Sequence, residues 1–173
     1  MDLAQHIRNV PDFPSPGIQF KDITTLLLVP EAFQECIRLF KARYADNPPD
    51  AIVGVDARGF IFGAALAHDM GLPFVTARKK GKLPGDTLSR EYALEYGTAI
   101  VEIHRDAISP GQKVVIIDDL LATGGTVAAV SHLIAELGAE VTEAAFVVEL
   151  PPLGGRTHLA PMSVHSLVEF MVE

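Results

Sequence analysis

Tryptophan is absent from this sequence of 173 residues, and cysteine occurs once, as Cys36. Any stacking on a planar ligand must therefore use phenylalanine or tyrosine. A single cysteine cannot form a disulfide within the chain, which fits a reducing, cytoplasmic environment. Cys36 lies in a segment with the hydrophobic spacing of an amphipathic helix, so we expect a buried thiol rather than a reactive one.

Long hydrophobic runs are also missing, although 49% of the residues are hydrophobic. No run approaches the ~18–20 apolar residues that cross a bilayer, and the first residues do not resemble a signal peptide, so we expect neither a membrane span nor secretion. Positive charge is scarce: 14 Lys and Arg against 22 Asp and Glu leave a formal net charge of −8. Non-specific binding to nucleic acid is thereby disfavoured, and an anionic ligand would need a local cluster of cations.

Segments with strand and helix character alternate along the chain. Apolar runs predict buried strands at 51–55, 73–77, 113–117, 141–148 and 164–168, and hydrophobic periodicity predicts helices at 2–9, 31–45, 59–70 and 125–137. This alternation indicates an α/β fold, with a mostly parallel sheet flanked by helices. No linker or repeat divides residues 1–173, so we expect one domain. Prolines predict irregular chain around Phe20, and the polar stretch 78–98 indicates a lid or a disordered insert. The plainer alternative for 85–97 is a β-hairpin flap with surface tyrosines.

The most informative segment runs from Val114 to Thr126. A buried strand ends there in two adjacent carboxylates, Asp118 and Asp119, and a loop of small residues opens a helix. Backbone N–H groups at such a helix start bind anions, so the loop predicts a phosphate cradle beyond the carboxyl end of the strand. The acids would repel that phosphate, but they accept hydrogen bonds well from a sugar diol. Together they predict a site for a ribose 5-phosphate.

Three other interpretations of this segment explain less of it. A Walker B strand needs a partner loop of the form Gly-x-x-x-x-Gly-Lys-Ser/Thr, which the sequence lacks. The dinucleotide-binding pattern Gly-x-Gly-x-x-Gly is missing as well. A plain turn whose aspartates cap the helix explains neither the doubled acid nor the doubled glycine.

A basic cluster begins the polar stretch. Arg78, Lys79, Lys80 and Lys82 place four of the 14 cations within five residues, which in an acidic chain indicates a local anion site. The plainer alternative is a solvated basic loop. Arg58 follows the strand predicted at 51–55 and should lie at the same edge of the sheet, where a guanidinium can bind a pyrophosphate through two hydrogen bonds.

The segment 118–126 resembles the signature that binds phosphoribosyl pyrophosphate (PRPP) in the type I phosphoribosyltransferases. Segments similar to those of family members that act on adenine follow in order at 13–22, 56–60, 78–84, 94–97, 148–150 and 155–156. The resemblance implies the type I fold, with a small hood contributed mainly by the N-terminal segment and a flexible lid at about 78–98. It also implies an enzyme of purine salvage, which transfers the 5-phosphoribosyl group of PRPP to adenine and gives AMP and pyrophosphate.

The resemblance assigns roles to residues as well. It implies catalytic roles for Glu95 and Arg58, and adenine binding by Phe20, Lys21, Leu120 and Leu150. Pyrophosphate would be bound by Arg58, Arg78, Lys79 and Lys82. PRPP would be bound by Asp118, Asp119, Ala122, Thr123, Gly124, Gly125 and Thr126. Magnesium would arrive on PRPP without a direct protein ligand, and the protein would be a cytoplasmic homodimer with neither nucleic acid nor membrane as a partner.

Two other functions stay open on the residues alone. A phosphoribosyltransferase for hypoxanthine, guanine or orotate would share the PRPP signature and differ in the base-side segments. A regulator that senses PRPP would bind it without turnover. Such a regulator usually carries a DNA-binding module, for which this acidic chain has no spare length.

Overall fold

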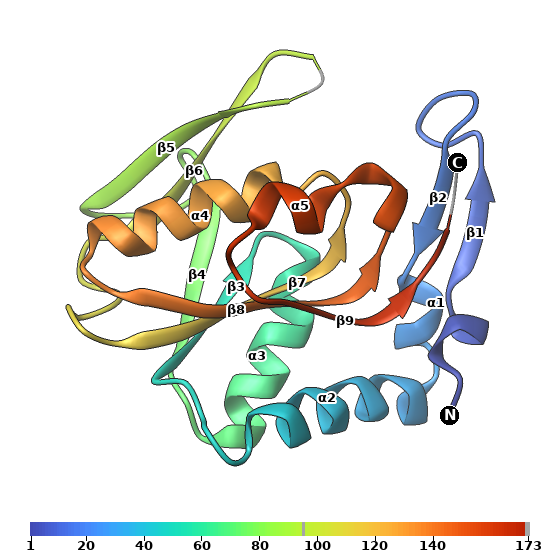
Figure 1. Cartoon of the computed structure of the whole chain (residues 1–173), viewed down its shortest axis with the longest axis horizontal. Coiled ribbons are helices and arrows are strands. Elements are labelled where there is room, and N and C mark those ends of the chain that lie inside the picture. Colours follow the sequence, from blue (N-terminus) through green and yellow to red (C-terminus); the bar gives the residue numbers. More distant parts are fainter. Residues whose placement is uncertain (95, 172–173) are drawn as a thin grey trace.

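The computed structural model describes residues 1–94 and 96–171, and Figure 1 shows how they are arranged. Within these residues a seven-stranded sheet forms the centre of the molecule, in the order β5-β6-β4-β3-β7-β8-β9. The parallel strands are β4 (Phe74–Lys79), β3 (Ala51–Val55), β7 (Lys113–Leu121), β8 (Glu140–Glu149) and β9 (Val164–Glu169). An antiparallel hairpin of β5 (Thr87–Ala93) and β6 (Thr98–His104) extends the sheet beyond β4.

Helices cover both faces of the parallel strands (Figure 1). One face carries α2 (Pro30–Tyr44) and α3 (Arg58–Met70), and the other carries α4 (Gly125–Glu136) and the short α5 (Gly155–Leu159). Neighbouring residues of a strand point to opposite faces, so Val53 packs on the α4 side and Ile52 packs on the α2–α3 side. β3 and the middle of β7 and β8 are apolar because both of their faces are covered.

The topology changes direction between β3 and β7. β3 leads through α3 to β4, and β7 leads through α4 to β8 on the other side, which leaves a crevice at the carboxyl ends of β3 and β7. β7 pairs with β3 only as far as Ile117, but it continues beside β8 to Leu121. The last residues of β7 therefore border the crevice. The acids at 118 and 119 thus lie within the strand and do not follow its end.

The N-terminal segment forms a small separate layer, which we call the hood. The 3-10 helix η1 (Leu3–His6) precedes β1 (Arg8–Pro11), which pairs antiparallel with β2 (Gln19–Asp22), and α1 (Thr24–Leu27) then leads into α2. An ion pair of 2.5 Å between Arg8 and Asp22 joins the two strands of the hood. In Figure 1 the hood stands at the opposite end of the molecule from the β5–β6 hairpin.

The helices and strands predicted for the core are confirmed with bounds that differ by a few residues. Cys36 is buried in α2, as expected, and burial together with the charge of Glu35 raises the pKa of its thiol to about 12. Among the helices of the described residues, none has the length and apolar character that crossing a bilayer requires.

Two local predictions are wrong: residues 2–9 form η1 and the start of β1, and Phe20 lies in β2 rather than in irregular chain. Of the alternatives for 78–98, the described residues form the end of β4 and the β5–β6 hairpin rather than a disordered insert, and the lid stays a prediction. β1 and β5 are exposed on part of their length, and β2 is half-buried throughout. They therefore lack the continuous apolar run that marks the central strands. A short 3-10 helix, η2 (Pro151–Leu153), follows β8.

Candidate active site

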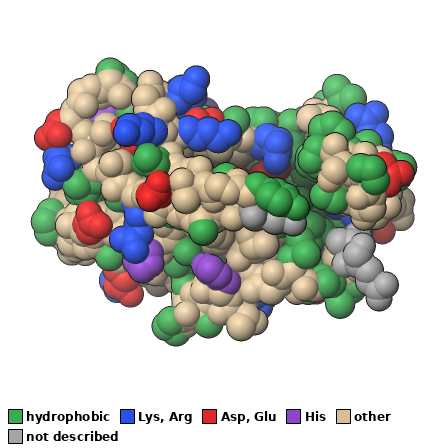
Figure 2. All heavy atoms as spheres, turned by 90° about the horizontal axis from the view of Figure 1, so that it is seen from above, with side chains coloured by type: hydrophobic (Ala, Val, Ile, Leu, Met, Phe, Trp, Pro, Cys, Tyr) green, Lys and Arg blue, Asp and Glu red, His purple; other side chains and the backbone are tan. Residues whose placement is uncertain are grey.

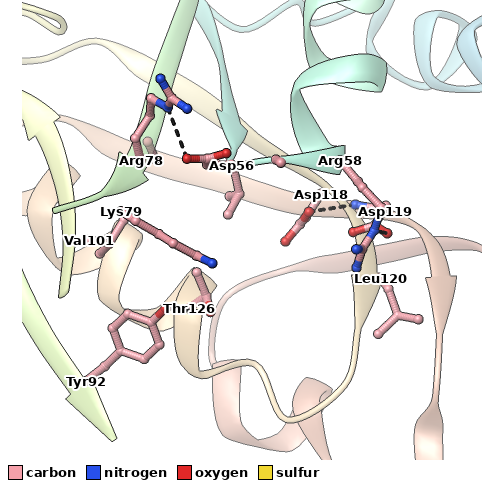
Figure 3. Close-up of a pocket in the computed structure, with 13 residues that line it drawn as sticks. Asp56, Arg58, Arg78, Lys79, Tyr92, Val101, Asp118, Asp119, Leu120 and Thr126 are labelled. Carbon is pink, nitrogen blue, oxygen red and sulfur yellow. Dashed lines mark hydrogen bonds and ion pairs between the residues drawn. The ribbon is translucent and has the colours of Figure 1, made fainter. Parts of the chain in front are cut away.

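Three hollows in the described part of the chain adjoin one another at the crevice. The central cavity, of about 300 Å³, is bordered by the ends of β3, β4 and β7 and by β5 (Figure 3). It shares Asp118, Leu120 and Thr126 with a smaller hollow of about 110 Å³ over the loop after β7. It shares Arg58 with a pocket of about 400 Å³ at the hood. A ligand with three parts could therefore lie across all three.

The loop after β7 has the predicted form of a phosphate cradle. Gly124 has a φ of +86°, a left-handed conformation that favours glycine, and α4 begins at the next residue. The first N–H groups of α4 have no partner within the helix, so they are available to an anion at this end. The smaller hollow is lined by all five of the predicted loop residues, Ala122, Thr123, Gly124, Gly125 and Thr126.

The two adjacent acids differ in their surroundings. Asp119 is 5% exposed, and its Oδ2 accepts a hydrogen bond of 2.5 Å from Nε of Arg58. Asp118 points into the central cavity (Figure 3), where burial and the charge of Asp119 raise the pKa of its carboxyl well above the ordinary value. Hydroxyl donors or a cation at this position would stabilise its charged form.

Gly59 brings α3 close to these acids. A Cβ at this position would lie 2.8 Å from the carbonyl oxygen of Ile117 and 2.9 Å from Oδ1 of Asp118, both too close for a side chain. The glycine after Arg58 thus allows the first turn of α3 to pack directly on β7. As a result Arg58, the first residue of α3, reaches the carboxylate of Asp119.

Cations line the other side of the central cavity. Arg78 donates from Nε to Oδ2 of Asp56 at 3.0 Å, and its guanidinium carbon lies 5.6 Å from the ring centroid of Phe60. Lys79 extends its ammonium group into the cavity (Figure 3). Together with Arg58 they concentrate positive charge in a chain of net charge −8. Figure 2, viewed from the side of the hairpin and hood, shows Lys and Arg side chains at several points across this face.

The pocket at the hood has aromatic walls. The rings of Phe13 and Phe20 pack edge to face with centroids 5.1 Å apart, and the guanidinium carbon of Arg58 lies 5.9 Å from the Phe20 centroid. Phe13 is 50% exposed and Phe20 is partly buried. The two rings therefore leave an open apolar surface on which a planar ring can stack. The pocket is completed by Val10, Asp22, Ile23 and Thr24.

Among the described residues, three predicted site residues do not line these hollows. Lys82 is exposed in the turn after β4. Lys21 points from β2 toward Phe170, with its Nζ 4.5 Å from that ring's centroid. Leu150 is buried directly after β8. Glu95 lies outside the described residues, so its predicted role stays a prediction.

The sequence alone did not assign Asp56, Phe13 or Tyr92 to the site. Asp56 directly follows β3 and pairs with Arg78, so its position at a strand end was a usable signal. Phe13 belongs to the segment that contains Phe20. Tyr92 reaches the central cavity from β5, and its place depends on how the β5–β6 hairpin lies against α4, which the sequence pattern does not show.

Known proteins resemble this chain over almost its whole length. A family model described as the phosphoribosyl transferase domain matches residues 22–158. The adenine phosphoribosyltransferase of Chloroflexus aurantiacus is 56% identical over 169 residues, which cover 98% of each chain. The crystal structure of adenine phosphoribosyltransferase from Thermoanaerobacter pseudethanolicus matches with a TM-score of 0.94 at 48% identity, over 98% of each chain.

A further solved structure carries ligands. It is the adenine phosphoribosyltransferase of Saccharomyces cerevisiae, complexed with D-2,5-dideoxy-2,5-imino-altritol 1,6-bisphosphate and adenine. It matches with a TM-score of 0.91 at 40% identity and covers 96% of each chain. The sheet, hood and hairpin described above therefore have the fold of these proteins.

Proposed function

The chain belongs to the phosphoribosyltransferase family and has its type I fold, and we propose that it transfers the 5-phosphoribosyl group of PRPP to adenine. The products are AMP and pyrophosphate, and the reaction is one of purine salvage. The observation that carries this function is the row of three adjoining hollows. The aromatic pocket suits a base. The cavity with cations and carboxylates suits a ribose that bears pyrophosphate, and the loop after β7 suits a 5′-phosphate.

The PRPP site uses the strand and loop that the sequence signature marks. Residues 122–126 hold the 5′-phosphate through backbone N–H groups and threonine hydroxyls. Asp118 and Asp119 accept hydrogen bonds from the two ribose hydroxyls, which supplies the donors that the buried acids require.

Pyrophosphate is bound by the cations of the central cavity. Arg58 uses its Nε for Asp119, so its terminal N–H groups are left for an anion. Arg78 and Lys79 face the same space, and Lys82 contributes from the exposed turn. In the reaction the bond from the sugar C1 to the pyrophosphate oxygen breaks, and positive charge develops on the sugar. The cations stabilise the negative charge of the leaving group, while the pockets align the base with the sugar carbon.

Adenine lies against Phe20 in the pocket at the hood. The ring nitrogen of the base forms the new bond to C1 and the base loses a proton, for which Glu95 is the proposed acceptor. Because the Lys21 side chain points toward Phe170, Lys21 contributes through its backbone beside Phe20. Leu120 lines the central cavity and Leu150 is buried directly after β8, and we assign both to the apolar surroundings of the base.

Magnesium enters as part of the substrate, bound to PRPP. Among the described residues, no three His, Cys, Asp or Glu side chains come together as a metal site. The nearby acids Asp118 and Asp119 suit hydrogen bonds to the sugar, so the oxygen ligands of the ion come mainly from PRPP and water. A homodimer and a cytoplasmic location also belong to this proposal, supported by the family resemblance and, for the location, by the single buried cysteine.

One assay tests the function. Purified protein is given PRPP, magnesium and either adenine, hypoxanthine or guanine, and both nucleotide and pyrophosphate are measured. We expect stoichiometric AMP and pyrophosphate, with the highest kcat/KM for adenine. A higher kcat/KM for hypoxanthine or guanine would contradict the assignment of the base. PRPP binding without any nucleotide product would favour the regulator instead.

A further inference from the structure

Tyr92 connects the β5–β6 hairpin to the phosphate loop. Its ring packs at the start of α4, where a Cβ on Gly125 would lie 3.7 Å from Cδ2 of Tyr92. Its hydroxyl oxygen lies 3.2 Å from Oγ1 of Thr126. Both side chains line the central cavity, and Figure 3 shows them side by side at its wall. Thr126 also lines the hollow that we assign to the 5′-phosphate.

The hydrogen bond between these hydroxyls can reverse when a phosphate binds. A threonine hydroxyl carries one proton, which Thr126 donates to the oxygen of Tyr92. A bound phosphate presents acceptor oxygens, so Thr126 would turn its proton to the phosphate. The oxygen of Thr126 is then free to accept a proton, and the phenol of Tyr92 is already at hydrogen-bond distance to supply it. Two hydroxyls in series would then both be polarised toward the phosphate.

We propose that Tyr92 is a positioning residue for the 5′-phosphate end of PRPP and AMP, and that it acts through Thr126. This inference rests on the function proposed above. Tyr92 holds the hydroxyl of Thr126 in place, and phosphate binding strengthens the contact between β5 and the loop.

Tyr92→Phe removes the hydroxyl and keeps the ring that packs on α4. We expect the Kd of AMP and the KM of PRPP to rise about 2- to 12-fold, the effect of one neutral hydrogen bond. The Kd of pyrophosphate and the KM of adenine should stay within about twofold, because neither ligand carries the 5′-phosphate. Ser89→Ala removes a hydroxyl from an exposed position of the same strand and should change none of these values.

A double variant tests the route through Thr126. If Tyr92 acts through Thr126, the losses of AMP affinity in Tyr92→Phe and Thr126→Val should not add in the combined variant. Hydrogen exchange provides a second measurement. AMP should slow exchange of the β5 amides in the wild-type protein, and it should slow them less in Thr126→Val, which gives a result even if Tyr92→Phe fails to fold.

Several outcomes would overturn the inference: a folded Tyr92→Phe variant with wild-type affinity for AMP, an equal loss of pyrophosphate affinity, full additivity in the double variant, or undiminished protection of β5 in Thr126→Val. Wild-type protein that formed no AMP would contradict the proposed function instead, whatever the result at Tyr92.

Discussion

Arg58 donates a hydrogen bond of 2.5 Å to Asp119, and the same guanidinium lies 5.9 Å from the ring centroid of Phe20. The first residue of α3 thus joins the strand assigned to the ribose with the pocket assigned to adenine. Asp119 is 5% exposed, so its charge would be buried without a partner if Arg58 were absent. The Arg58 side chain is 49% exposed, which leaves part of it accessible to a ligand.

Replacing Asp119 with alanine should mainly damage the use of PRPP. The variant loses a charge-assisted hydrogen bond to a ribose hydroxyl, worth ~1.5–3 kcal/mol. We therefore expect kcat/KM for PRPP to fall roughly 10- to 150-fold at saturating adenine. Asp46→Ala, which removes an exposed acid from the loop after α2, is the control. A folded Asp119→Ala variant with unchanged PRPP kinetics would show that this acid does not bind the sugar.

Phe20→Leu should weaken adenine binding and spare PRPP. Losing one stacked aromatic ring costs on the order of 1–3 kcal/mol, so the KM of adenine should rise about 5- to 150-fold. Phe33, whose ring packs 5.6 Å from that of Phe62 beneath the sheet, gives a matched comparison. Phe33→Leu should lower the thermal midpoint and leave the adenine kinetics normal. The opposite pattern, with Phe20→Leu destabilised but kinetically normal, would make Phe20 a packing residue.

Glu102 fixes the turn that carries the lysines. It is 7% exposed and accepts hydrogen bonds from the backbone N–H of Gly81 at 2.9 Å and from the hydroxyl of Thr87 at 2.7 Å. These bonds, that of Thr87 foremost, lower the pKa of its carboxyl. In Glu102→Gln the amide oxygen can still accept from Gly81 and the amide NH2 can donate to the Thr87 hydroxyl, so both bonds lose the assistance of the charge and become weaker.

The loosened turn should hold Lys79 and Lys82 less firmly. We expect the Kd of pyrophosphate to rise roughly 2- to 12-fold in Glu102→Gln, while the Kd of AMP stays unchanged. Titration calorimetry with each ligand separates these two effects. If AMP and pyrophosphate weakened equally, the substitution would have disturbed the whole site rather than the turn.

Glu95 is predicted from the sequence to assist proton loss from adenine or to order the lid. General acid–base help is typically worth ~100- to 10,000-fold in rate. If Glu95 takes the proton, Glu95→Gln and Glu95→Ala should both lower kcat strongly in a single-turnover experiment. If it only orders the lid, glutamine should retain most of the rate and alanine should not. Wild-type rates in both variants would leave Glu95 with neither role.

The sequence predicts the centre of the fold better than its periphery, for a physical reason. β3 and residues 114–117 of β7 are buried, so each is a continuous apolar run, and the acids and glycines of the site follow residue 117. The hood and hairpin strands are stabilised by pairing with distant partners, such as Val10 with Phe20. The pattern of apolar and polar residues within one segment does not show which distant strand it pairs with. The sequence could therefore not predict that the Lys21 side chain points toward Phe170, nor that Tyr92 approaches Thr126.

Glu143 of β8 anchors α2 to the sheet, away from the candidate site. It is 7% exposed and accepts hydrogen bonds from Arg43 at 2.5 and 2.8 Å, from the Tyr44 hydroxyl at 2.7 Å and from Ser163 at 2.7 Å. Burial alone would raise the pKa of this carboxyl, but the hydrogen bonds, that from Arg43 first, outweigh it and lower the pKa to about 2. In the unfolded chain the carboxyl titrates near 4.5.

This lowered pKa predicts a dependence of stability on pH. Charged Glu143 stabilises the fold fully above the unfolded pKa, and the contribution is lost as the pH falls from about 4.5 toward 2. Glu143→Gln cannot titrate, so it should be less stable than the wild type by ~1–3 kcal/mol near neutral pH. The difference should shrink as the pH falls through that window. Urea unfolding at a series of pH values measures it, with Glu31→Gln, an exposed acid of α2, as the control. A difference that stayed constant down to about pH 2 would show that the charge of Glu143 is not the source of the stabilisation.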